Sequence, residues 1–300
     1  METIDLIIVI VYLLAIVMVG MIAQKKASEG IDSYFLGNRK LPWWALGASG
    51  MASNTDIAGT MINTAFIYAL GTKGFFIEIR GGVTLIMAFL MVFMGKWNRR
   101  SQVMTQAEWM HFRFGKGKEG DIARIISATA AIIMTIAMVT YFVLGAGKFV
   151  GEFIGVEPIY ASLIMVVLAM LYTLASGLYG VVWTDVFQGI FIFGVIIYVS
   201  VIAMTTVNLP EEFFISIPMK DGTFSSIKIL LSDWASMTPP LEMDMPESSA
   251  YSIYNLFGIS IMFYLFKVTL EGSSGAGGYM LQSYFAARSD RDAGLLSLFW

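Results

Sequence analysis

Seven long apolar runs divide this sequence, and each is close to the length of a helix that crosses a lipid bilayer. The runs cover residues 4–23, 44–70, 75–94, 122–150, 159–175, 181–207 and 251–270. A transmembrane helix needs about 20 mainly apolar residues, and its backbone polar groups must pair within the membrane. The runs lack the period-two alternation of barrel strands. The sequence therefore predicts an all-α polytopic membrane protein with about seven transmembrane helices.

The composition argues against several other classes of protein. Hydrophobic residues make up 57% and charged residues 14% of the chain, whereas soluble domains carry about 25% charged residues. The chain has no cysteine for a disulfide or a thiol nucleophile, and one histidine, His111, does not make a metal centre or a Ser-His-Asp triad. The net charge of −3 gives no reason to expect nucleic acid as a partner. We therefore predict a non-enzymatic protein of the lipid bilayer that needs no cofactor.

Basic residues set the predicted orientation, because connectors rich in Lys and Arg stay in the cytoplasm. They gather in alternate connectors: Lys25, Lys26, Arg39 and Lys40; then Lys96, Arg99, Arg100, Arg113, Lys116 and Lys118; then Arg288 and Arg291. This pattern predicts a multi-pass protein of the cell membrane (plasma or bacterial inner membrane) with its N-terminus outside. It also places the segment 208–250 outside, as an extracellular loop.

Two connectors are longer than simple turns. Residues 101–117 are amphipathic and follow a basic helix end, which predicts an interfacial or re-entrant cytoplasmic helix. The proline-containing loop 208–250 is predicted to hold a short helix at 225–234. It is either a lid over an outward vestibule or a solvated spacer, and the spacer is the simpler interpretation.

The second apolar run is interrupted by polar and small residues halfway across the bilayer. Asn54 and Asp56 lie there among glycine, alanine and serine. A charged side chain at the centre of a membrane helix costs at least about 2.5–3.5 kcal/mol on insertion scales, so it should face a polar cavity or a partner. A glycine-interrupted span is the best sequence pointer to the central site of a transporter. The alternative is a seam in which Gly47, Ser49, Gly50 and Ser53 only allow close helix packing.

Two further carboxylates fall inside predicted spans. Glu78 lies near the outer end of the third span, where a partner on another helix is expected. Asp185 lies one turn inside the cytoplasmic end of the sixth span. A carboxylate that stabilises a helix N-terminus is a sufficient alternative account of Asp185.

Three segments resemble signatures of a known family. The run Ser33–Trp44, with the small-residue stretch after it, is similar to the entrance of the first core helix in the solute:sodium symporter family. Gly177–Gln188 resembles the second signature of that family and Leu281–Ser289 the third. The resemblance implies a fold of two inverted five-helix repeats with a broken first core helix. This chain would hold one preceding helix, the first repeat and the opening helix of the second, as a single transmembrane domain 1–300 that is incomplete at its C-terminus.

The resemblance also implies roles for individual residues. The family's sodium site takes two backbone carbonyls from the broken helix, which fall on Ala52 and Thr55, and Asp185 matches an aspartate linked to sodium exit. Asn54 and Glu78 match residues on the substrate side. The remaining sodium ligands lie, in the family, on a later helix, so the missing C-terminal helices are an implied partner.

The sequence thus predicts sodium-coupled secondary-active symport of a small polar solute, with Asn54, Asp56 and Glu78 against the solute. Sodium is the coupling ion. Gly59 stands where the sugar cotransporters carry a large polar contact, so the substrate class stays open. Two alternatives also stay open: a symporter-like membrane sensor module of a signalling protein, and an inactive truncated fragment.

Overall fold

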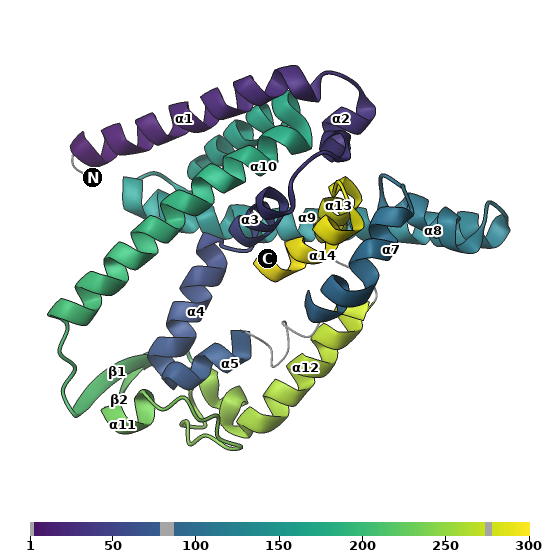
Figure 1. Ribbon diagram of the computed structural model, residues 1–300. Helices are drawn as coiled ribbons and strands as arrows, with labels where there is room; N and C mark the ends of the chain where they lie inside the picture. Colours follow the sequence, from purple (N-terminus) through teal and green to yellow (C-terminus); the bar gives the residue numbers. More distant parts are fainter. Residues whose placement is uncertain (1–2, 79–86, 274–277) are drawn as a thin grey trace. The chain divides into compact units, whose positions relative to one another are not determined.

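The computed structural model describes residues 3–78, 87–273 and 278–300, and they are mostly helical (Figure 1). The first half comprises α1 (Thr3–Ala27), α2 (Ile31–Leu36), η1 (Gly37–Arg39), α3 (Trp43–Ser53), α4 (Ile57–Leu70), η2 (Thr72–Gly74), α5 (Phe75–Glu78), the π-helix η3 (Leu90–Met94), α7 (Gly95–Arg100), α8 (Gln106–Phe114) and α9 (Lys118–Ile154). The second half comprises α10 (Pro158–Thr206), β1 (Glu212–Pro218), β2 (Phe224–Leu230), α11 (Leu231–Trp234), η4 (Ala250–Leu256), α12 (Phe257–Ser273), α13 (Gly278–Ala286) and α14 (Asp290–Phe299).

Contacts divide the chain into two compact units. The first unit comprises Met1–Ala58, Met87–Gly194 and Gly275–Trp300, and the second comprises Gly59–Ile86 and Val195–Ser274. The predicted helix break therefore lies at the edge of the first unit, and the predicted outer loop lies wholly in the second.

Within the described residues, three helices are long and apolar enough to cross a membrane: Ile7–Lys25, Lys118–Ile154 and Pro158–Thr206. Their large apolar side chains, such as Ile125, Ile133 and Ile197, are exposed. Extensive apolar exposure on such helices is typical of a surface that faces lipid, so the chain is a membrane protein. The count of seven spans stays a prediction, and part of the third predicted span lies outside the described residues.

The fifth and sixth predicted spans fall within the single element α10. Gly177 interrupts it, with φ 54° and ψ −159°, outside helical geometry. A side chain at this position would lie 2.4 Å from the backbone oxygen of Tyr34 in α2. The Tyr34 hydroxyl in turn donates to the carbonyl of Leu174, at 3.0 Å. The two spans therefore meet directly at a glycine, which no other residue replaces without strain.

We expect Gly177→Ala to lower the free energy of unfolding by about 1–3 kcal/mol, because alanine meets both an unfavourable positive φ and the Tyr34 backbone. Thermal unfolding of the detergent-purified protein measures the effect. Gly194→Ala is the matched control, since Gly194 lies in the same helix and a side chain there meets no atom within 4 Å. Equal unfolding temperatures of the two variants would contradict the assignment.

The outer loop is partly β-structure, so the all-α prediction is wrong for this segment. Strands β1 and β2 pair antiparallel, with Ile215 opposite Ile227. Ile215 and Ile217 are buried while Phe214 and Ser216 are exposed, the alternation that favours a strand over a helix. The predicted helix at 225–234 is correct only over α11, because residues 224–230 form β2.

This loop packs as part of the second unit. Ile215, Ile217 and Phe257 share a buried cluster with Leu70 and Ile77. Polar contacts add to it: the Lys73 ammonium lies 2.6 Å from the Asp233 carboxylate, and the Trp234 indole donates to the carbonyl of Tyr68, at 3.2 Å. The hairpin and α11 are thereby fixed to the end of α4. A loop that only spans two helices in solvent would not require such packing.

Candidate functional site

The predicted break in the second apolar run is present in the structure. α3 ends at Ser53 and α4 begins at Ile57, so Asn54, Thr55 and Asp56 lie outside both helices. The side-chain amide of Asn54 donates to the carbonyl of Gly50, at 2.9 Å, and the Thr55 hydroxyl donates to that of Met51, at 3.2 Å. Short polar side chains compete in this way with the helical backbone pattern, and they end the helix here.

The break offers backbone oxygens at a polar helix end. The carbonyl of Ala52 accepts from the Thr55 amide, at 3.1 Å, and a carbonyl oxygen keeps a second lone pair for another ligand. The C-terminal end of α3 carries the negative end of the helix dipole, which favours a cation. Sodium is a hard cation that prefers oxygen ligands, so Ala52 and Thr55 fit part of its shell, but two carbonyls do not complete one.

Asp56 has a structural role open to it that the sequence analysis overlooked. It directly precedes α4, the position where Asp and Asn side chains accept hydrogen bonds from the first backbone amides of a helix. A negative charge there also meets the positive end of the helix dipole. The residue is half-buried. The helix-capping position and the predicted solute contact are compatible, because a carboxylate has two oxygens that accept hydrogen bonds.

Asp185 contacts α3 directly. Its Oδ2 accepts a hydrogen bond from the hydroxyl of buried Ser49, at 2.5 Å, and Ser53 lies beside the same carboxylate. Asp185 lies about two helical turns beyond Gly177, so it is not at a helix start. Stabilisation of a helix N-terminus therefore does not account for it. The carboxylate instead joins α10 to α3, one turn before the break.

Packing between α3 and α10 extends along both sides of this contact. The rings of Trp44 and Trp183 meet edge to face, with centroids 5.6 Å apart. At the other end, a side chain at Gly189 would lie 3.7 Å from the Ala52 side chain. α10 thus braces α3 as far as Ala52, the predicted sodium ligand.

A different face of α3 packs against α14. A side chain at Gly47 would lie 2.8 Å from the Phe299 side chain, and one at Gly50 would lie 2.4 Å from the Trp300 ring. The packing-seam interpretation is therefore correct for these two glycines. Ser49 differs from them, because its hydroxyl makes the polar contact with Asp185.

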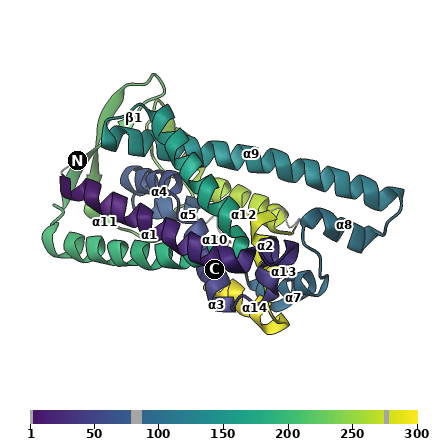
Figure 2. The ribbon, with the colours of Figure 1, turned by 90° about the horizontal axis from the view of Figure 1, so that it is seen from above.

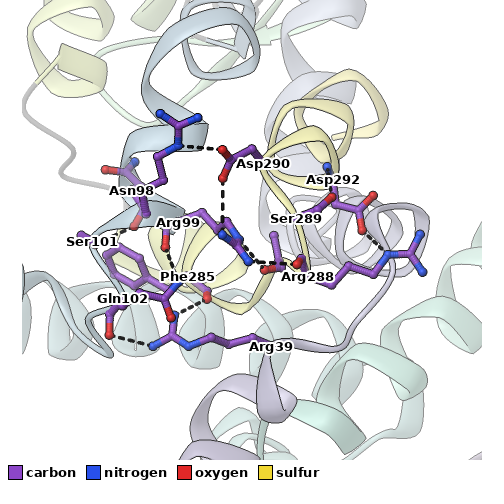
Figure 3. Close-up of polar contacts among 12 residues, drawn as sticks. Arg39, Asn98, Arg99, Ser101, Gln102, Phe285, Arg288, Ser289, Asp290 and Asp292 are labelled. Carbon is purple, nitrogen blue, oxygen red and sulfur yellow. Dashed lines mark hydrogen bonds and ion pairs between the residues drawn. The ribbon is translucent and has the colours of Figure 1, made fainter.

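The entrance to α3 is held by arginine side chains that the sequence analysis used only to assign orientation (Figure 3). The Arg39 guanidinium donates to the carbonyls of Phe285, at 2.7 Å, and Gln102, at 2.9 Å. Arg99 donates to the carbonyl of Arg288, at 3.0 Å, and the Arg100 guanidinium lies 2.6 Å from the Asp290 carboxylate. We call Arg39, Arg99 and Arg100 the arginine cluster. It joins η1, α7 and the junction of α13 with α14.

Arg39 stays charged at neutral pH although it is partly buried. Burial lowers the pKa of Arg39 from its usual value, but a guanidinium pKa starts so high that the group remains protonated at neutral pH. Its planar fork allows one side chain to bind several backbone oxygens at once. The Leu41 backbone also bridges to Ala287, which fixes the residues directly before α3.

The first signature-like segment contacts both of the others in the first unit. Tyr34 of the first contacts Gly177 of the second, and the Gln282 side chain of the third donates to the carbonyl of Phe35, at 2.8 Å. Glu78, the remaining predicted solute ligand, ends α5 in the second unit, and its side chain lies outside the described residues.

Comparison with known proteins places these features in context. The family model described as the sodium:solute symporter family matches residues 34–247. Sodium/glucose cotransporter 4 of Danio rerio is 30% identical over 142 residues, which are 45% of this chain and 20% of that protein. The sodium/glucose cotransporter of Vibrio parahaemolyticus is 26% identical over 166 residues, which are 53% of this chain and 29% of that protein.

A solved structure of a sodium-coupled sialic acid symporter, substrate-bound and outward-open, shares the fold. The TM-score is 0.71 at 19% identity, and the match covers 99% of this chain and 56% of the other. The chain therefore spans about half the length of that structure. Its matched segments span less than a third of the curated relatives.

Proposed function

Because the chain belongs to the sodium:solute symporter family, we propose that it takes part in sodium-coupled symport of a small polar solute. The observation that carries this proposal is the helix break at Asn54–Asp56, with the Ser49–Asp185 contact one turn before it. A broken membrane helix provides both carbonyl oxygens and a helix dipole end, which is how transporters of this architecture hold ions near the bilayer midplane.

In the proposed site, sodium binds the carbonyls of Ala52 and Thr55 at the end of α3. Asp185 lies in contact with the same helix and supplies a negative charge along the exit path of the ion. The solute binds beside the ion through Asn54 and Asp56, and Glu78 stays a sequence-based prediction of a further solute contact. Ligands from further helices of the whole protein complete the sodium shell.

We propose that alternating access involves the contacts that hold α3. Asp185 braces its middle, α14 packs on its small-residue face, and the arginine cluster holds its entrance. We propose that sodium binding at the break stabilises one arrangement of these contacts, and that solute binding permits the change to the other.

The experiment that tests this function is uptake by the whole protein in proteoliposomes with an inward sodium gradient, compared with an equal gradient of choline. Sugars, carboxylates and amino acids are offered in turn as labelled solutes. We expect one class to accumulate only with sodium. Uptake that is the same in both gradients would refute sodium coupling, and absence of uptake with every class would favour the sensor alternative.

We expect Asp56→Asn to raise the solute concentration for half-maximal uptake about tenfold, because it removes a charge-assisted hydrogen bond to the solute. Asparagine caps a helix as well as aspartate does, so this variant preserves the start of α4. Asp56→Ala removes both functions and serves as the comparison. If Asp56→Asn transports as well as the wild type and only Asp56→Ala is impaired, Asp56 is a helix cap and not a solute ligand.

A further inference from the structure

The connector between α7 and α9 contains α8, which forms a helical hairpin with the start of α9. α8 lies alongside the N-terminal end of α9 (Figure 2). The Thr105 hydroxyl accepts from the amide of Glu108, at 3.1 Å, and His111 Nε2 lies 2.8 Å from the Asp121 carboxylate of α9. At the turn, a side chain at Gly120 would lie 1.8 Å from the carbonyl of Gly115. Capping, an inter-helix contact and close backbone packing therefore fix α8 relative to α9.

This hairpin exposes large apolar side chains next to a membrane-spanning helix. Phe112 is 62% exposed and Phe114 is 55% exposed. The neighbouring start of α9 exposes Ile122, Ile125 and Ile126. Because α9 is long and apolar enough to cross the bilayer, its exposed isoleucines face lipid. Phe112 and Phe114 add exposed aromatic surface on α8, which packs beside the start of α9.

Exposed basic residues lie close in the sequence to the two phenylalanines. Arg113, Lys116, Lys118 and Arg124 are exposed, and the Arg113 guanidinium lies 6.0 Å from the centre of the Phe114 ring. The acidic residues of the hairpin are Glu108, whose carboxylate accepts from the amide of Met104, and Glu119 and Asp121, of which Asp121 is engaged by His111. The local balance is therefore positive, although the chain as a whole carries a net charge of −3.

The length of α9 places this surface at the depth of the lipid headgroups. Its 37 residues extend over about 55 Å, whereas the hydrocarbon core measures about 30 Å. This excess length allows the charged first turn of α9 (residues 118–121), and α8 beside it, to lie outside the core, with Ile122, Ile125 and Ile126 at its boundary. Aromatic side chains favour this depth, and long basic side chains bury their stems while their charges reach the headgroups.

We propose that the α8–α9 hairpin is a docking surface for anionic lipid headgroups, with Phe112 and Phe114 inserted at the headgroup boundary. Arg113, Lys116 and Lys118 then bind phosphate and carboxylate groups of lipids in the same leaflet. On the predicted orientation this is the cytoplasmic leaflet, the one that carries anionic lipid. Residues 101–105 connect the docked hairpin to the end of α7, which carries Arg99 and Arg100 of the arginine cluster, so membrane composition would influence the entrance to α3.

A fluorophore placed by a single cysteine tests this docking. The 300 residues contain no cysteine, so Phe112→Cys gives one label in this part of the chain. The whole protein is reconstituted in vesicles of phosphatidylcholine alone, or of phosphatidylcholine mixed with phosphatidylglycerol. A label at Ser226, exposed on β2, is the aqueous control. We expect the label at residue 112 to be protected from a water-soluble quencher, and more strongly so with phosphatidylglycerol.

Charge neutralisation separates lipid recognition from simple burial. The triple variant Arg113→Gln, Lys116→Gln and Lys118→Gln should abolish the effect of phosphatidylglycerol, with the ratio of docked to undocked label falling about fivefold per neutralised residue. Lys25→Gln, an exposed basic residue at the end of α1, should leave it unchanged. Equal quenching at residues 112 and 226 in both vesicles would overturn the proposal. Protection of the label at residue 112 that is the same with and without phosphatidylglycerol, and the same in the triple variant, would also overturn the proposal. The residue would then be buried by protein or by neutral lipid.

Discussion

Asp185→Asn is expected to raise the sodium concentration for half-maximal uptake by roughly ten- to a hundredfold, since interactions with a charged group contribute about 1.5–3 kcal/mol. Asparagine still presents an oxygen that accepts the Ser49 hydroxyl, so the contact between α3 and α10 survives while the negative charge is lost. Uptake measured against sodium concentration in proteoliposomes gives the result directly.

The Ser49→Ala variant separates the charge of Asp185 from its packing role. It removes the hydroxyl that lies 2.5 Å from the carboxylate and leaves the charge, so we expect only a several-fold loss of sodium affinity. Unfolding temperatures of both variants should stay close to that of the wild type. If Ser49→Ala is as defective as Asp185→Asn, the carboxylate acts by bracing α3, and its proposed role toward sodium is wrong.

The helix break was predictable because its cause is local. Asn54, Thr55 and Asp56 have short polar side chains that compete with backbone hydrogen bonds wherever they occur in a helix. α8 was predictable for the same reason, because its amphipathic pattern is also a local property of the sequence. The hairpin β1–β2 has a weaker local signal, because only Ile215-Ser216-Ile217 alternate between apolar and polar residues while Phe213 and Phe214 are both apolar. A helix was predicted over residues that form β2.

The arginine cluster was not predictable, because its contacts join distant parts of the chain. Arg39 and Phe285 are 246 positions apart, and Phe285 contributes only a backbone carbonyl, which any residue has. Neither periodicity nor residue type marks such an acceptor. Gly177 is similar: its positive φ is consistent with glycine, but the need for it comes from the Tyr34 backbone in α2.

The contacts give a physical reason for the three signature-like segments. Each contributes to the placement of α3: the first precedes it, the second supplies Asp185 and the glycine against Tyr34, and the third supplies the carbonyl that Arg39 binds. The signature residues outside the break therefore hold the broken helix in place. Their substitution should move α3 without changing the residues that form the break.

Replacing Arg39 tests this positioning most directly. Arg39→Ala removes hydrogen bonds to the carbonyls of Phe285, Gln102 and Val103, and each charge-assisted bond contributes about 1.5 kcal/mol or more when partly buried. The entrance to α3 should then loosen and uptake should fall at least about a hundredfold. A cysteine at Leu41, which is only 1% exposed, should become reactive toward a water-soluble maleimide in the Arg39→Ala background.

Graded and matched variants distinguish positioning from loss of a positive charge. Arg39→Lys keeps the charge, but a single ammonium does not span carbonyls on two segments, so its uptake and its Leu41 reactivity should lie between those of wild type and Arg39→Ala. Arg291→Gln removes a charge from an exposed arginine in the first turn of α14 and should change neither. Should Arg39→Lys match the wild type in both measurements, charge alone suffices at this position, and the geometric hold on α3 is not what Arg39 provides.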